Sequence, residues 1–228
     1  MFFYYNPSYL ALIAVTLVIG LATTAWCKSR LSKFRKIASS SGLTGAQMAQ
    51  RMLDNYGVVG VNVFQGGQDQ DFFNPKDNSI SLSPEVYNSS SITAQAVACH
   101  ECGHACQSAA KYGMIKFRNS LVPTVNAVSN IWPLLIVLGI IFHIAGLVFI
   151  AVALYAVAVL FHLVTLPVEF NASKRAIKFL KESALENDEE ISGSSAVLRA
   201  CALTYVGAAL ISILNLLYYL SFLTDNDR

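Results

Sequence analysis

Charged side chains are scarce in this sequence. Only 13% of the residues are Asp, Glu, Lys or Arg, while 54% are hydrophobic, and a soluble domain would carry about 25% charged residues. Three tracts, at 1–27, 119–168 and 200–223, contain none of these four residue types. Because a membrane-spanning helix needs about 20 apolar residues, the sequence predicts an integral membrane protein.

The sequence also lacks a strong net charge and a disulfide framework. A net charge of +2 is too small to indicate a nucleic-acid partner, so we expect none. The five cysteines are an odd number, and three of them crowd one predicted helix. This favours a reduced cytoplasmic environment over a set of disulfides.

The basic residues predict the orientation in the membrane. Five Lys and Arg residues lie within 28–36, and four more lie within 174–181. Such clusters mark cytoplasmic segments, although 28–36 is also compatible with a lipid-binding helix. The tract 119–168 is long enough for two spans joined by a turn near His143. We therefore expect four spans with both termini outside, in a bacterial plasma membrane.

The polar segments are expected to fold at the cytoplasmic surface. The sequence predicts a helix after Thr44, whose capping box is completed by Gln47, a strand at 58–64, a short strand at Ser79–Ser83, and an Ala-rich helix at 91–113. The chain then divides into an anchor (1–27), a cytoplasmic part (28–118), a two-span hairpin (119–168), a second cytoplasmic segment (169–200), and a last span with its tail (201–228). The expected fold is a mainly α membrane protein with a small α+β domain.

The Ala-rich helix carries the motif His100-Glu101-Cys102-Gly103-His104. Its two histidines lie one helical turn apart, so both imidazoles can bind one Zn²⁺. Glu101 is close enough to take a proton from a zinc-bound water without being a ligand. We therefore expect one Zn²⁺ per chain.

Three cysteines offer a rival metal site. Cys99 and Cys102 have zinc-finger spacing, but on a helical wheel they lie with Cys106 on the side facing away from the histidines. One metal therefore cannot bind both sets, and we expect the cysteines to pack in the core.

A catalytic zinc usually has three protein ligands, and the third is open from these residues alone. His143 lies at the expected outer turn, and His162 falls inside a span. Glu169 is the first charge after the long uncharged tract. It is equally compatible with a ligand and with an interfacial charge that anchors the helix end.

Three blocks in this order, HECGHACQ, LPVEFNASKRA and LRACALTYVGAA, resemble the membrane-bound neutral zinc metallopeptidases, the YugP-like family. That family is similar to the membrane heat-shock zinc proteases and the CAAX prenyl endoproteases. The resemblance implies a gluzincin-like zinc domain in which His100, His104 and Glu169 are ligands and Glu101 is the general base. The relatives usually carry an Asp four residues after the ligand Glu, and here Ser173 takes that position. Asn171 stands where close relatives often have Asp, so both are candidates to orient a zinc histidine.

The predicted function is peptide-bond hydrolysis at the cytoplasmic membrane surface. The expected substrates are peptides or membrane proteins, and the spans are expected to contact membrane lipid. An extended substrate is expected to pair with an edge strand formed by Ser79, Ile80, Ser81, Leu82 and Ser83. Tyr205 and Arg199 are candidates to stabilise the tetrahedral intermediate. The alternatives are a catalytically idle scaffold that retains zinc and an intramembrane protease. The sequence indicates no particular oligomer or regulatory partner.

Overall fold

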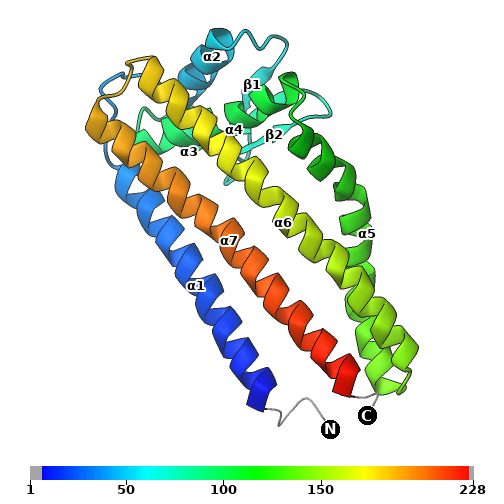
Figure 1. Cartoon of the computed structure of the whole chain (residues 1–228). Helices are drawn as coiled ribbons and strands as arrows, with labels where there is room; N and C mark the ends of the chain where they lie inside the picture. The colour runs from blue at the N-terminus through cyan, green and yellow to red at the C-terminus, as the bar shows by residue number, and fades with distance from the viewer. Residues whose placement is uncertain (1–6, 226–228) are drawn as a thin grey trace. The chain divides into compact units, whose positions relative to one another are not determined.

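The computed structural model describes residues 7–225 and is mainly helical (Figure 1). The outermost residues of both termini, which the topology prediction places outside, therefore fall beyond the described part of the chain. In chain order the elements are α1 (Pro7–Arg35), α2 (Gly45–Asn55), β1 (Asn62–Gln65), β2 (Phe72–Asn74), β3 (Ser79–Leu82), α3 (Pro84–Tyr87), α4 (Ile92–Ala109), α5 (Gly113–Ile141), α6 (Ala145–Glu182) and α7 (Asp188–Asp225).

Four helices are long and apolar enough to cross a membrane. They are α1, α5, α6 and most of α7, and each contains an 18-residue window that is strongly hydrophobic and nearly free of charge. The four predicted spans are confirmed by length and composition. The predicted turn is also present, because α5 ends at Ile141 and α6 begins at Ala145, with His143 between them in the left-handed region at φ 55°.

The chain divides into two compact units, and the long helices contribute residues to both. In the described part of the chain, the first unit comprises residues 7–23, 117–166 and 204–225. Within it α1 and α7 run side by side (Figure 1), and a Cβ added at Gly20 would lie 3.7 Å from Ile211. An aromatic cluster joins Trp132 of α5, Tyr155 of α6 and Tyr219 of α7.

The second unit comprises residues 24–116 and 167–203 and contains a three-stranded sheet in the order β1-β3-β2. β3 pairs in parallel with β1, with Ile80 opposite Val63, and antiparallel with β2, with Ile80 opposite Phe73. The prediction that Ser79–Ser83 forms an edge strand is therefore wrong, because both sides of β3 are already paired. β2, which the sequence analysis did not predict, is an edge strand.

The core of this second unit confirms several local predictions. Thr44 and Gln47 form the predicted capping box of α2 through reciprocal hydrogen bonds. Cys99, Cys102 and Cys106 are buried in the hydrophobic core, as their position on the helical wheel predicted. Other buried members of this core are Met48, Met52, Leu53, Ile80, Leu82, Phe179 and Leu180.

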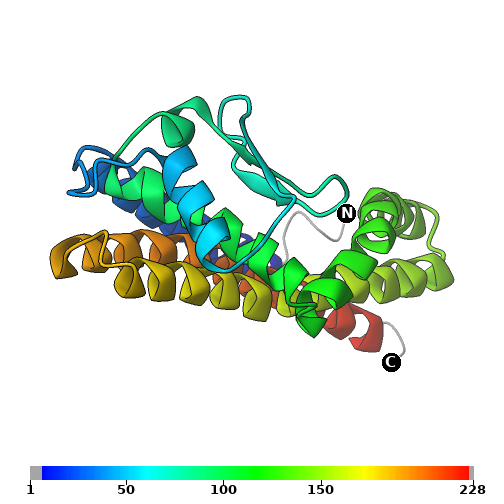
Figure 2. The same cartoon turned by 90° about the horizontal axis from the view of Figure 1, so that it is seen from above.

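Helices α4 and α6 approach each other closely at Gly103. A Cβ atom added there would lie 2.6 Å from the carbonyl oxygen of Ala172 and 3.0 Å from its Cα. Figure 2 shows α4 lying between the small sheet and α6. Since these contacts are with backbone atoms, only glycine lets the two helices come this close.

We predict that Gly103→Ala destabilises the second unit. In a helix interior Ala is normally favoured over Gly by about 1 kcal/mol, but here its methyl group must separate two backbones, and overpacking costs about 1–3 kcal/mol. Thermal unfolding of the purified protein in detergent measures the effect. Gly113→Ala is the matched control, because nothing lies within 4 Å of a Cβ at Gly113. A Gly103→Ala melting temperature equal to that of the control would contradict the close approach.

Candidate metal centre

Two imidazoles and one carboxylate converge where α4 meets α6. His100 and His104 lie on successive turns of α4, and Glu169 lies on α6. Glu169 Oε2 is 3.2 Å from His100 Nε2 and 3.6 Å from His104 Nε2. The Glu169 side chain is only 3% exposed, and the histidine side chains are 15% and 12% exposed, so the cluster is nearly closed to solvent.

The second nitrogen of each histidine is hydrogen-bonded by a neighbouring side chain. Gln107 Oε1 lies 3.1 Å from His104 Nδ1. Because an amide oxygen only accepts, His104 Nδ1 donates to Gln107, and the other ring nitrogen, Nε2, faces Glu169. Ser173 Oγ lies 3.1 Å from His100 Nδ1. The structure thus places Ser173 where the resemblance implied an orienting group.

Asn171 is connected to the second histidine through Gln107. The Gln107 amide nitrogen donates to Asn171 Oδ1 at 3.0 Å and to the Val168 carbonyl at 2.8 Å, and Arg175 also donates to Asn171. These bonds orient the Gln107 amide so that its oxygen faces His104. The sequence analysis missed Gln107, although its position three residues after His104 puts both on one face of α4.

The electrostatics of the cluster favour an ionised Glu169. Its Oε2 atom lies 3.2 Å from His100 Nε2 and 3.6 Å from His104 Nε2, and two imidazoles this close favour the charged form of a buried carboxyl. Burial by itself would lower the pKa of His104, yet the hydrogen bond with Glu169 and the nearby Glu101 raise it. The site therefore holds a carboxylate stabilised by the two imidazoles.

Glu101 lies beside this cluster and bonds to the sheet. Its carboxylate accepts a hydrogen bond of 2.9 Å from the Phe73 backbone N–H on edge strand β2. Burial raises the pKa of Glu101, and the neighbouring His100 and His104 oppose that rise. The sequence analysis did not predict the contact with Phe73, because a backbone donor leaves no pattern in the sequence.

The geometry fits a zinc ion. Ligands of a tetrahedral Zn²⁺ at about 2.0–2.1 Å lie about 3.3 Å from one another, which is close to the two distances measured here. One ligand atom from each of His100, His104 and Glu169 lies within 4.8 Å of the others. Because Nε2 of both histidines and Oε2 of Glu169 face one another, the three residues can hold such an ion.

The other predicted site residues are distributed differently. His162 and Tyr205 belong to the first unit, and His143 lies in the α5–α6 turn. Arg199 lies in the second unit and lines a pocket. Among residues 7–225, no hydrogen bond or ion pair joins Arg199 to the metal cluster, so stabilisation of an intermediate by Arg199 or Tyr205 stays a prediction.

Comparisons with known proteins identify the family of this chain. The family model described as "Putative neutral zinc metallopeptidase" matches residues 9–224. The chain is 42% identical over 218 residues to a Bacillus subtilis (strain 168) protein described as "Putative membrane protease YugP", covering 92% of this chain and 96% of that protein. No solved structure matches the chain significantly. The match over nearly the whole length, together with the histidine–glutamate cluster, shows that the chain belongs to the YugP-like family of neutral zinc metallopeptidases.

Proposed function

We propose that this protein is an integral membrane zinc endopeptidase of the gluzincin type. The observation that carries the proposal is the convergence of His100 and His104 Nε2 on one oxygen of Glu169, with Glu101 beside them. In this proposal the first three residues are the ligands of one Zn²⁺, and Glu101 acts on the reaction without binding the metal. Its substrates are peptides or membrane proteins.

Glu101 is the proposed general base. When bound, the metal supplies a Lewis acid that polarises a peptide carbonyl and acidifies the attacking water. Glu101 takes the proton of that water and then donates it to the leaving amine. Its buried carboxylate is held in place by the Phe73 N–H, while Ser173 and Gln107 keep the histidine rings from rotating. An intact base argues against a catalytically idle scaffold.

Because β3 is a central strand, we propose edge strand β2 as the strand that binds the substrate. The Phe73 N–H points away from β3 toward Glu101, so it lies on the free edge of the sheet and faces the metal cluster. Zinc peptidases hold extended peptides by backbone pairing with such an edge. We propose that a substrate carbonyl takes the Phe73 N–H from Glu101, which releases the carboxylate for proton transfer.

We also propose that the site faces the cytoplasm and lies at the membrane surface. Lys28–Lys36 and the basic residues of 174–181 belong to cytoplasmic segments by the charge rule. His100 and His104 lie in a helix outside the four candidate spans, and Glu169 of α6 directly follows the uncharged tract that ends at Val168. This argues against an intramembrane protease, in which the motif would lie within a span.

Two substitutions separate the role of the base from that of the ligands. Glu101→Gln cannot accept a proton at neutral pH, so peptide hydrolysis should fall by about 10²–10⁴-fold, while zinc measured by elemental analysis stays near one per chain. Glu169→Ala should lose zinc and activity together, because it removes a ligand. If Glu101→Gln cleaves a peptide as fast as the wild type, or if Glu169→Ala keeps its full zinc content, the assigned roles are wrong.

Another prediction concerns edge strand β2. Phe73→Pro and Phe73→Ala both remove the ring, but only Phe73→Pro removes the N–H, and proline is tolerated on an edge strand. We expect kcat/KM to be about tenfold lower for Phe73→Pro than for Phe73→Ala, the effect of one lost hydrogen bond, with equal zinc content. Equal kcat/KM for the two variants would exclude substrate pairing at Phe73.

The orientation can be tested by cysteine labelling. In a background with the five native cysteines replaced, Lys36→Cys and Lys181→Cys introduce thiols at exposed positions. We expect a membrane-impermeant maleimide to leave both unlabelled in intact cells and to label both after permeabilisation. Labelling of either position in intact cells would place that segment, and the proposed active site with it, outside.

A further inference from the structure

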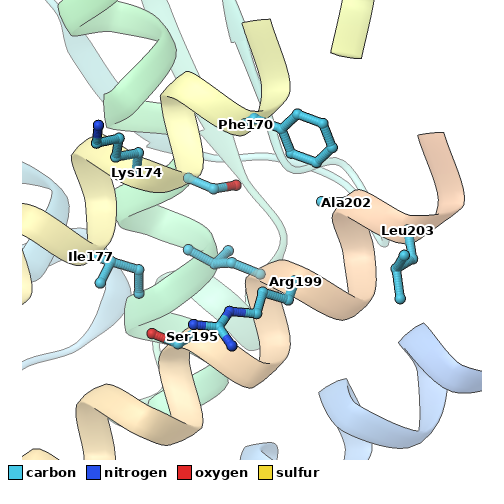
Figure 3. Close-up of a pocket in the computed structure, with 9 residues that line it drawn as sticks. Phe170, Lys174, Ile177, Ser195, Arg199, Ala202 and Leu203 are labelled. Carbon is cyan, nitrogen blue, oxygen red and sulfur yellow. The ribbon is translucent and has the colours of Figure 1, made fainter. Parts of the chain in front are cut away.

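A pocket of about 520 Å³ lies between α6 and α7 in the second unit. Figure 3 shows Phe170, Lys174 and Ile177 lining it from α6, and Ser195, Arg199, Ala202 and Leu203 lining it from α7. Most of these walls are apolar. The pocket is therefore suited to a ligand with a hydrocarbon part.

Two basic side chains contribute to the otherwise apolar pocket. Lys174 and Arg199 come from opposite helices (Figure 3) and are exposed. Within residues 7–225 neither has a carboxylate partner within 4 Å, whereas Arg35 and Lys178 each have one. The pocket thus offers positive charge that the described chain does not neutralise, which favours an anionic ligand.

The pocket residues also stand at the border of the uncharged tracts. Phe170 and Lys174 follow the tract that ends at Val168, and Arg199 directly precedes the tract that begins at Ala200. In a membrane protein this is where apolar side chains give way to charged ones, at the depth of the lipid headgroups. Basic pockets between spanning helices at that depth bind anionic lipid headgroups.

The pocket adjoins the metal cluster at Ser173. Ser173 lines it and bonds to His100 through Nδ1, whereas the metal-facing nitrogen Nε2 points to Glu169. The free edge of β2 meets Glu101 from a different element. A peptide bound along β2 would therefore not be held by α6 and α7, the two helices that line this pocket. This favours a different occupant for the pocket.

We propose that this pocket binds one anionic phospholipid, with its phosphodiester near Lys174 and Arg199 and its acyl chains along Phe170, Ile177 and Leu203. A zwitterionic lipid of the same chain length would gain the apolar contacts but would carry no net charge to pair with the two cations. The site therefore selects by headgroup charge.

The test measures lipid binding to the full-length protein in detergent by native mass spectrometry. Phosphatidylglycerol and phosphatidylcholine with identical acyl chains are titrated separately. We expect phosphatidylglycerol to bind at least fivefold more tightly than phosphatidylcholine. The double variant Lys174→Gln with Arg199→Gln should remove that preference, because each cation contributes about fivefold to the binding of the anionic lipid. Ala202→Leu, which fills the pocket and keeps both charges, should weaken both lipids.

The matched control is Lys178→Gln with Lys181→Gln, which removes the same charge from exposed positions of α6 that do not line the pocket. This control should keep the phosphatidylglycerol preference. An equal loss in both double variants would show general surface attraction, and no preference in the wild type would exclude a selective site. Either result overturns the proposal.

Two further arms exclude other occupants. Glycerol phosphate at the same concentration should not displace the lipid, because it lacks the acyl chains; displacement would show a free-phosphate site instead. If the pocket variants raise KM for a cleaved peptide while lipid binding is unchanged, the pocket serves the peptide and the proposal is wrong. Lipid binding does not depend on hydrolysis, so these outcomes are independent of the proposed peptidase activity.

Discussion

The backbones of α4 and α6 meet at Gly103 and Ala172, and the metal cluster depends on that contact. His100 and His104 lie on either side of Gly103, and Glu169 lies one turn before Ala172 on the facing helix. With a larger residue at 103 the helices would separate, and Glu169 would no longer reach both imidazoles. The two variable positions of the H-E-x-x-H motif thus serve packing, with Cys102 in the core and Gly103 at the helix crossing.

This close packing buries charge, and the surrounding hydrogen bonds make that burial tolerable. An isolated buried carboxylate would be costly, but Glu169 is paired with two imidazoles, each fixed at its other nitrogen by Ser173 or Gln107. Gln107 is in turn held by Val168 and Asn171. The network keeps the donor atoms in place, so that a metal ion would replace interactions between the residues without rearranging them.

In the small sheet, the sequence pattern correctly predicted strand β3 but wrongly placed it at the edge of the sheet. The alternation of Ser with Ile80 and Leu82 predicted β3, but it also suggested a half-exposed edge. All four residues of β3 are buried, and Ser79 and Ser81 donate to Asp77 and to the Gln70 carbonyl. Serine is small enough to be buried when a neighbouring acceptor satisfies its hydroxyl, so period-two polarity does not distinguish an edge strand from a central one.

The sequence by itself determined the features that depend on local chemistry. Uncharged tracts long enough to span a bilayer, the turn at His143, the capping box at Thr44, and the buried face of Cys99, Cys102 and Cys106 all follow from composition or helical period. Only the tertiary structure decided which residues meet across the chain: Glu169 with His100 and His104, Gln107 with Asn171, Phe73 with Glu101, and β3 between β1 and β2. The resemblance to a family implied the first of these contacts, but residue spacing alone left it open. The physical reason is that local propensity acts over a few residues, whereas these contacts join segments that only the packing of α4 against α6 and the sheet brings together.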